Sequence, residues 1–144
     1  MKLTPFHLAI QVRDIDEARE FYGSKLGFAE GRSSSQWIDF NMFGHQLVTH
    51  LNIQIGKPGE ISAITNAVDG HGVPVPHFGV VLNLQEWQLL ADRITEVIDH
   101  FIIDPYIRFK GEVGEQATMF FADPSGNFLE FKAFKNIDAE LFAK

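Results

Sequence analysis

Asp123-Pro124-Ser125-Gly126-Asn127 runs directly into Phe128-Leu129-Glu130-Phe131, which joins a turn signal to a strand signal near the end of the sequence. Asp, Pro, Ser, Gly and Asn all favour turns, so residues 123–127 predict a tight turn. The following residues alternate and predict a strand over 128–134, in which Glu130 shares a face with Phe128 and Lys132. A carboxylate among aromatic residues is costly to bury without a partner, and a cation is a suitable partner.

Two histidines open similar segments 70 residues apart. His7 begins the run Leu8-Ala9-Ile10-Gln11-Val12, and His77 begins the run Phe78-Gly79-Val80-Val81-Leu82. Each run alternates like a strand and leads into a helical pattern, predicted over 15–26 and 86–98. Three further strands are predicted after each helix. The order strand, helix, three strands therefore occurs twice, which indicates an internal duplication.

The duplication predicts a single mixed α+β domain over residues 1–144, built from two βαβββ modules. The modules are expected at about 5–55 and 75–135, joined by a Gly- and Pro-rich linker or functional loop over 56–74. We expect two curved sheets, each covered on its apolar face by its helix, with the opposite faces around a central cavity. The polar residues on the faces predicted to line this cavity are His7, Gln46, His50, His77, Tyr106, Arg108 and Glu130.

The amino-acid composition and net charge exclude several classes of protein. Hydrophobic residues make up 45% of the chain and charged residues 22%, ordinary values for a globular domain. The chain has no cysteine, which excludes disulfides, thiolate metal sites and cysteine nucleophiles. The net charge of −7 argues against nonspecific nucleic-acid binding. No apolar run reaches the roughly 20 residues of a membrane span, and no signal-peptide pattern is visible, so a cytoplasmic protein without nucleic-acid or membrane partners is expected.

The chain resembles the glyoxalase, bleomycin-resistance and extradiol dioxygenase superfamily, also called vicinal oxygen chelate proteins. The likeness is carried by residues 7–14, 18–22 and 26–28, and again by 77–80 and 120–130. The turn Asp-Pro-Ser-Gly-Asn followed by a strand glutamate is its most specific part. The resemblance implies paired βαβββ modules, usually in a dimer, and a divalent metal held by residues of the first and last strand of each module.

By this resemblance His7, His77 and Glu130 match metal-ligand positions. His50, on the last predicted strand of the first module, falls near the fourth position. It is interpreted as catalytic, with a fourth ligand, an acid or base beside the metal, and a plain cavity residue as open alternatives. Two imidazoles and a carboxylate suit Fe(II), the favoured metal, and also Mn(II), Zn(II) or Ni(II).

Further polar residues are predicted to bind the substrate. Tyr106, Arg108 and Lys110 share one side of a strand predicted over 101–110, and Arg forks suit carboxylate or phosphate groups. The alternative for these three is a solvated strand edge. Gln46 is the fourth predicted substrate-binding residue. Surface roles are expected for the remaining histidines, which are His45, His71 and His100.

These observations predict a metal-dependent enzyme whose small substrate chelates the metal through two vicinal oxygens. Extradiol dioxygenase-like chemistry is narrowly favoured. A glyoxalase-like lyase or isomerase and a thiol transferase remain open on the same site, because fold does not choose chemistry. A metal-free binding protein of the bleomycin-resistance type is the alternative from another class. We expect a homodimer in which the site lies within one chain or is shared by two chains that exchange modules.

Overall fold

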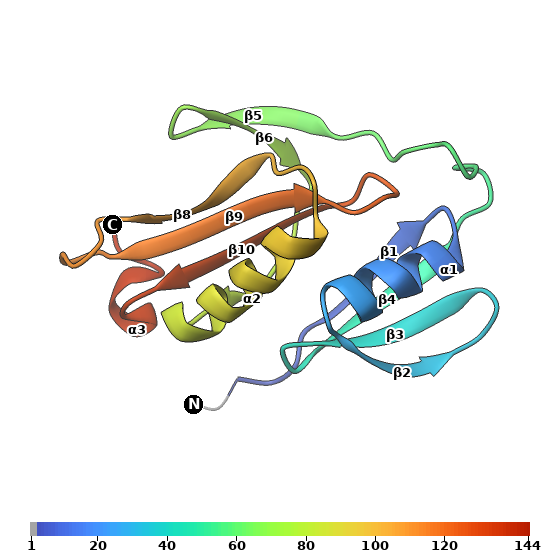
Figure 1. Cartoon of the computed structure of the whole chain (residues 1–144), viewed down its shortest axis with the longest axis horizontal. Helices are drawn as coiled ribbons and strands as arrows, with labels where there is room; N and C mark the ends of the chain where they lie inside the picture. The colour runs from blue at the N-terminus through green and yellow to red at the C-terminus, as the bar shows by residue number, and fades with distance from the viewer. Residues whose placement is uncertain (1–2) are drawn as a thin grey trace. The chain divides into compact units, whose positions relative to one another are not determined.

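The computed structural model describes residues 3–144 and divides the chain into two compact units. The first unit is the N-terminal part up to Ser62 together with Asp123–Asn127, and the second is Ala63–Ala122 together with Phe128–Lys144. Each carries the predicted order of a strand, a helix and three strands, so the mixed α+β class with two βαβββ modules is confirmed (Figure 1).

The first unit is a four-stranded sheet with one helical layer. Its sheet has the order β1-β4-β3-β2, with β1 parallel to β4 and antiparallel pairing elsewhere. Tyr22 and Phe40 are buried where the helical layer packs on the sheet, with ring centroids 5.7 Å apart. The elements are β1 (His7–Val12), α1 (Ile15–Ala18), the π-helix η1 (Arg19–Lys25), β2 (Ala29–Ser33), β3 (Trp37–Met42) and β4 (His45–Leu51).

The helix predicted over 15–26 is present, but its second half is a π-helix. Its start follows the predicted cap, because the Asp14 side chain accepts a hydrogen bond from the backbone N–H of Glu17 at 2.8 Å. Gly27 follows the last helical turn with φ of 79°, a left-handed conformation that glycine adopts readily. Wider helical turns of this kind have no simple sequence signature, so the pattern alone predicts an ordinary helix.

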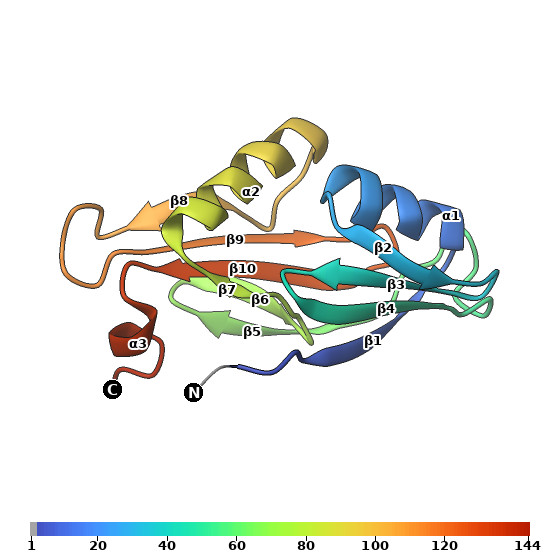
Figure 2. The same cartoon turned by 90° about the horizontal axis from the view of Figure 1, so that it is seen from below.

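The second unit has a four-stranded sheet of order β7-β10-β9-β8 and a separate hairpin of β5 and β6. Figure 2 shows α2 on one face of the four-stranded sheet and the hairpin on the other. Trp87 of α2 is buried and its indole N–H donates to the carbonyl of Phe131 at 2.9 Å. The elements are β5 (Ile64–Val68), β6 (His71–Val75), β7 (Val81–Leu82), α2 (Leu84–Val97), β8 (Ile103–Arg108), β9 (Gln116–Ala122), β10 (Phe128–Phe134) and α3 (Ile137–Glu140).

The hairpin corrects the prediction of a linker or loop over 56–74. Asp69 and Gly70, at its tip, have φ of 48° and 83°, and positive φ at both central residues is what a tight two-residue hairpin turn requires. Asp-Gly is a preferred sequence for that turn. The high Gly and Pro content of residues 56–74 favoured a loop in the sequence analysis, so the Asp-Gly turn did not lead to a predicted hairpin. This element matters for function because it covers one side of a pocket in the second unit.

Two strands of the second unit are shorter than predicted. The run from His77 to Asn83 forms only β7 and a single bridge between Phe78 and Leu129, and Asn83 instead caps α2. The strand predicted over 101–110 ends at Arg108, after which Phe109 has φ of 54°. In the part of the chain that the structure describes, no helix is long and apolar enough to span a membrane.

Candidate metal centre and pocket

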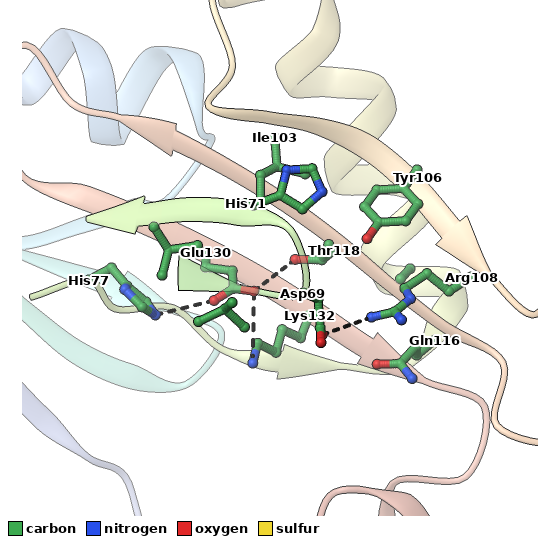
Figure 3. Close-up of a pocket in the computed structure, with 13 residues that line it drawn as sticks. Asp69, His71, His77, Ile103, Tyr106, Arg108, Gln116, Thr118, Glu130 and Lys132 are labelled. Carbon is green, nitrogen blue, oxygen red and sulfur yellow. Dashed lines mark hydrogen bonds and ion pairs between the residues drawn. The ribbon is translucent and has the colours of Figure 1, made fainter. Parts of the chain in front are cut away.

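A pocket of about 180 Å³ lies in the second unit, between its sheet and the β5–β6 hairpin. Because side chains alternate along a strand, the face turned away from α2 presents Thr118 of β9 together with Glu130 and Lys132 of β10. Figure 3 shows these side chains with His77 at one end of the pocket and Arg108 at the other. The pocket is rich in charged and hydrogen-bonding groups, which suits a small polar ligand.

His77 and Glu130 form the centre of this site. Nε2 of His77 lies 3.3 Å from Oε2 of Glu130. The other ring nitrogen, Nδ1, lies 2.6 Å from the carbonyl oxygen of Pro74 and donates to it, since a carbonyl only accepts. In the neutral ring this bond leaves Nε2 with its lone pair directed at a carboxylate. Two acceptors in contact need a proton or a cation between them.

Glu130 is held in place by groups on its own face of the sheet. The Thr118 hydroxyl donates to Oε1 of Glu130 at 2.9 Å, and the Lys132 ammonium lies 3.8 Å from the same oxygen. The side chain is 14% exposed. Oε1 is thus occupied by protein donors while Oε2 faces His77. A metal-binding carboxylate is commonly oriented in this way by hydrogen bonds to its second oxygen.

His7 lies on β1 of the first unit and shows the same anchoring. Its Nδ1 is 2.7 Å from Oε1 of Gln46, the residue beside it on β4, and donates to that amide oxygen. Within residues 3–144 no hydrogen bond is formed by Nε2, which is therefore available to a ligand. Metal-binding histidines almost always donate their second ring nitrogen to such an acceptor, so the anchoring of His7, and separately that of His77 beside Glu130, suits ligands of a divalent metal. Within residues 3–144 no three His, Cys, Asp or Glu side chains gather as a metal-binding group.

The register of the strands locates the counterpart of Glu130 in the first module. Gly79, two residues after His77, lies beside Glu130, because Phe78 pairs with Leu129 and Val81 pairs with Lys132. In the first module Ala9 occupies the same place after His7, and its partner on β4 is Val48.

The residue equivalent to Glu130 is therefore the buried, apolar Val48. His50 lies two residues further along, exposed, next to Gln11 and Trp37. Its catalytic role stays a prediction, and the register gives it no ligand position.

The predicted substrate-binding residues divide into two groups. Tyr106 and Arg108 of β8 line the pocket that holds Glu130, whereas Lys110 lies in the turn beyond β8 and does not. Gln46 orients His7. The hairpin adds two residues that sequence reasoning missed, Asp69 and His71. His71 was expected at the surface. It is exposed, but it begins β6 and lines the pocket. The only sequence signal for this position is Asp69-Gly70, which predicts a hairpin turn directly before His71.

A buried carboxylate, that of Asp123, stabilises the turn 123–127. Asp123 accepts hydrogen bonds from the Tyr22 hydroxyl at 2.7 Å, from the backbone N–H groups of Ser125 and Asn127, and from the Asn127 amide. Burial raises the pKa of Asp123, and these hydrogen bonds oppose that rise. Burial also raises the pKa of Tyr22 well above its ordinary value. The motif that carries the resemblance is thus structural at Asp123.

Comparisons with known proteins agree with this architecture. A sequence profile of the Glyoxalase/Bleomycin resistance protein/Dioxygenase superfamily matches residues 4–131. A solved structure described as a glyoxalase/bleomycin resistance protein/dioxygenase from Alicyclobacillus acidocaldarius is 34% identical over 93% of both chains, with a TM-score of 0.70. The chain belongs to this superfamily.

Two more distant structures share the fold. A glyoxalase/dioxygenase from Nostoc punctiforme is 19% identical over 90% of both chains, with a TM-score of 0.65. The genomically encoded fosfomycin resistance protein FosX from Listeria monocytogenes is 17% identical, with a TM-score of 0.62, over 92% of this chain and 94% of that one. No match was found among curated proteins.

Proposed function

We propose that the protein is a metal-dependent enzyme in which His7, His77 and Glu130 bind one divalent metal. The observation that carries this proposal is the contact between Nε2 of His77 and Oε2 of Glu130 at 3.3 Å, with Nδ1 of the ring already committed to Pro74. His7 contributes a third donor with the same anchoring on Gln46. His7 joins the pair either within one chain or from the partner in a homodimer with exchanged modules.

The chain's own residues supply what a small chelating substrate needs. Glu130 and the two histidines leave coordination positions open, and a divalent metal bound there supplies a Lewis acid for two neighbouring substrate oxygens. Tyr106 and Arg108 line the same pocket as hydrogen-bond donors. His50 is proposed to move a substrate proton.

Extradiol dioxygenase-like chemistry with Fe(II) is the reaction we favour. Two histidines and one carboxylate are the donor set that suits non-haem Fe(II) and oxygen. The same donors are compatible with lyase, isomerase or thiol-transfer chemistry with Mn(II), Ni(II) or Zn(II). The same contact between His77 and Glu130 is also compatible with a metal-free binding protein. In that protein His77 would carry a proton and would form an ion pair with Glu130.

Reconstitution with separate metals tests these options. Chelator-treated protein is loaded anaerobically with Fe(II), and oxygen uptake is followed with a panel of catechols. We expect oxygen uptake and a ring-opened product in the wild type, and neither in Glu130→Gln. If the protein turns over only 2-oxoaldehyde–thiol adducts or epoxides, and does so with Mn(II), Ni(II) or Zn(II), the reaction is lyase, isomerase or thiol-transfer chemistry and not dioxygenase chemistry. Ligand binding that is unchanged by chelator, without metal uptake, would favour the binding protein.

A further inference from the structure

Arg108 has spare hydrogen-bonding capacity that Arg13 and Arg19 lack. Arg13 donates to both carboxylate oxygens of Glu17 and to the carbonyl of Gly59, and Arg19 forks onto Glu30. Arg108 makes one hydrogen bond to a described residue, from Nη1 to Oδ2 of Asp69 at 3.2 Å. Its remaining N–H donors are open to a ligand, and its side chain is 35% exposed.

The position of Asp69 allows a ligand to replace it as the hydrogen-bond partner of Arg108. It lies at the tip of the β5–β6 hairpin and its side chain is 68% exposed, so it returns to water at little cost. An ion pair at such an exposed position contributes little stability. A ligand carboxylate or phosphate that engages the guanidinium with two oxygens makes a stronger contact than the single bond to Asp69.

The pocket has the layout for a ligand with two recognition points. The His77–Glu130 pair lies at one end and the Arg108–Asp69 pair at the other, with Thr118 and Lys132 between them (Figure 3). A substrate held through vicinal oxygens at the first end therefore presents its far side to Arg108. The surrounding side chains add a second cation, Lys132, to the same pocket.

We propose that Arg108 binds an acidic group of the substrate and that Asp69 is the internal anion that this group displaces. The Arg108–Asp69 pair then sets the specificity for acidic over neutral vicinal diols. This inference rests on the proposed function, because the metal holds the other end of the substrate. The replacement of Asp69 by a ligand anion at Arg108 can be tested without metal.

The first test uses inorganic phosphate and chelator-treated protein, with binding followed by ¹⁵N NMR at the Arg108 side chain and the Asp69–Gly70 amides. Asp69→Asn removes the competing charge and keeps the turn, since Asn tolerates positive φ and Asn-Gly is preferred there. We expect Asp69→Asn to bind phosphate about fivefold more tightly than the wild type, the factor that a surface ion pair supplies. Arg108→Gln should lose the binding, and Arg93→Gln, an exposed site on α2, should match the wild type. Equal binding by Arg108→Gln, or no gain in Asp69→Asn, would overturn the exchange.

The second test uses zinc-loaded protein and a matched pair of ligands, catechol and 3,4-dihydroxybenzoate. We expect the wild type to prefer the acid by about tenfold, because a charge-assisted hydrogen bond is gained. The preference should vanish in Arg108→Gln, whereas Arg93→Gln should keep both the preference and the catechol affinity of the wild type. An unchanged preference would refute the inference and leave the proposed function standing. Failure of zinc and catechol to bind at all would refute the proposed function, and the phosphate result would still decide the exchange.

Discussion

Tyr22→Phe removes one hydroxyl from the buried cluster that fixes the turn before β10. The hydroxyl donates to Asp123 at 2.7 Å, and both residues are buried, at 0% and 5% exposure. A hydrogen bond to a charged group is worth about 1.5–3 kcal/mol. We therefore expect the free energy of unfolding at pH 7 to fall by about 2 kcal/mol. The remaining donors to Asp123, from Ser125 and Asn127, prevent a larger loss.

The effect should depend on pH in a defined direction. Burial raises the pKa of Asp123 in the folded protein above its ordinary value of 3.8, and the Tyr22 hydroxyl opposes that rise. The folded state therefore binds more protons between the two values, and the contribution of Asp123 to stability falls as pH rises through this window. Tyr22→Phe raises the pKa of Asp123 further. Its cost should be largest at pH 7 and should shrink as Asp123 is protonated toward pH 4 and below.

Urea unfolding followed by tryptophan fluorescence measures this difference at several pH values. Comparison of mutant and wild type at each pH cancels titrating groups that the substitution does not affect. Tyr106→Phe is the matched control, because it removes the same atom from a side chain that is 37% exposed. A cost below about 0.5 kcal/mol at pH 7, the range of ordinary surface substitutions, would refute the reasoning. So would a cost that does not change with pH.

Two further substitutions test how the neighbours of Glu130 support it. Gly79→Ala places a Cβ in steric clash with the Glu130 carbonyl oxygen. We therefore expect a loss of about 1–3 kcal/mol in the free energy of unfolding and weaker metal binding. Gly23→Ala, whose Cβ meets Phe40 at an ordinary 3.7 Å, should show neither. Thr118→Val removes the hydroxyl that orients Glu130 and should weaken metal affinity about 10- to 100-fold, as measured by competition with a chelator dye. Thr95→Val, which removes a hydroxyl bonded within α2, should leave metal affinity unchanged; equal effects of the paired variants would contradict both expectations.

The fold was largely predictable because its strongest signals are local. Asp14 caps the first helix as its spacing with Glu17 predicts, and the turn 123–127 leads into an alternating strand as expected. The π-helix over 19–25 was not predictable, because a wider turn does not alter the apolar stripe enough to be recognised. The β5–β6 hairpin was missed because Gly and Pro weigh toward a loop when only composition is considered.

The sequence predicted that His77 and Glu130 lie together, and the two side chains are in contact. Their role as metal ligands stays a prediction. The anchors of the two histidines, Gln46 and the Pro74 carbonyl, depend on tertiary neighbours that no periodicity reveals. Strand register decided that Val48 rather than His50 is equivalent to Glu130, and register cannot be read from alternation alone.

The most direct test of the proposed metal centre is the metal content of untagged protein purified without chelator and, for iron, without air. Wild type, His7→Ala, His77→Ala and Glu130→Ala are compared, with Glu96→Ala as a control at an exposed carboxylate on α2. We expect about one metal per chain in the wild type and the control, the stoichiometry of a single site with these donors. Each of the three ligand variants should lose it. No metal in the wild type, with no uptake on titration, would contradict the account, as would full metal content in Glu130→Ala.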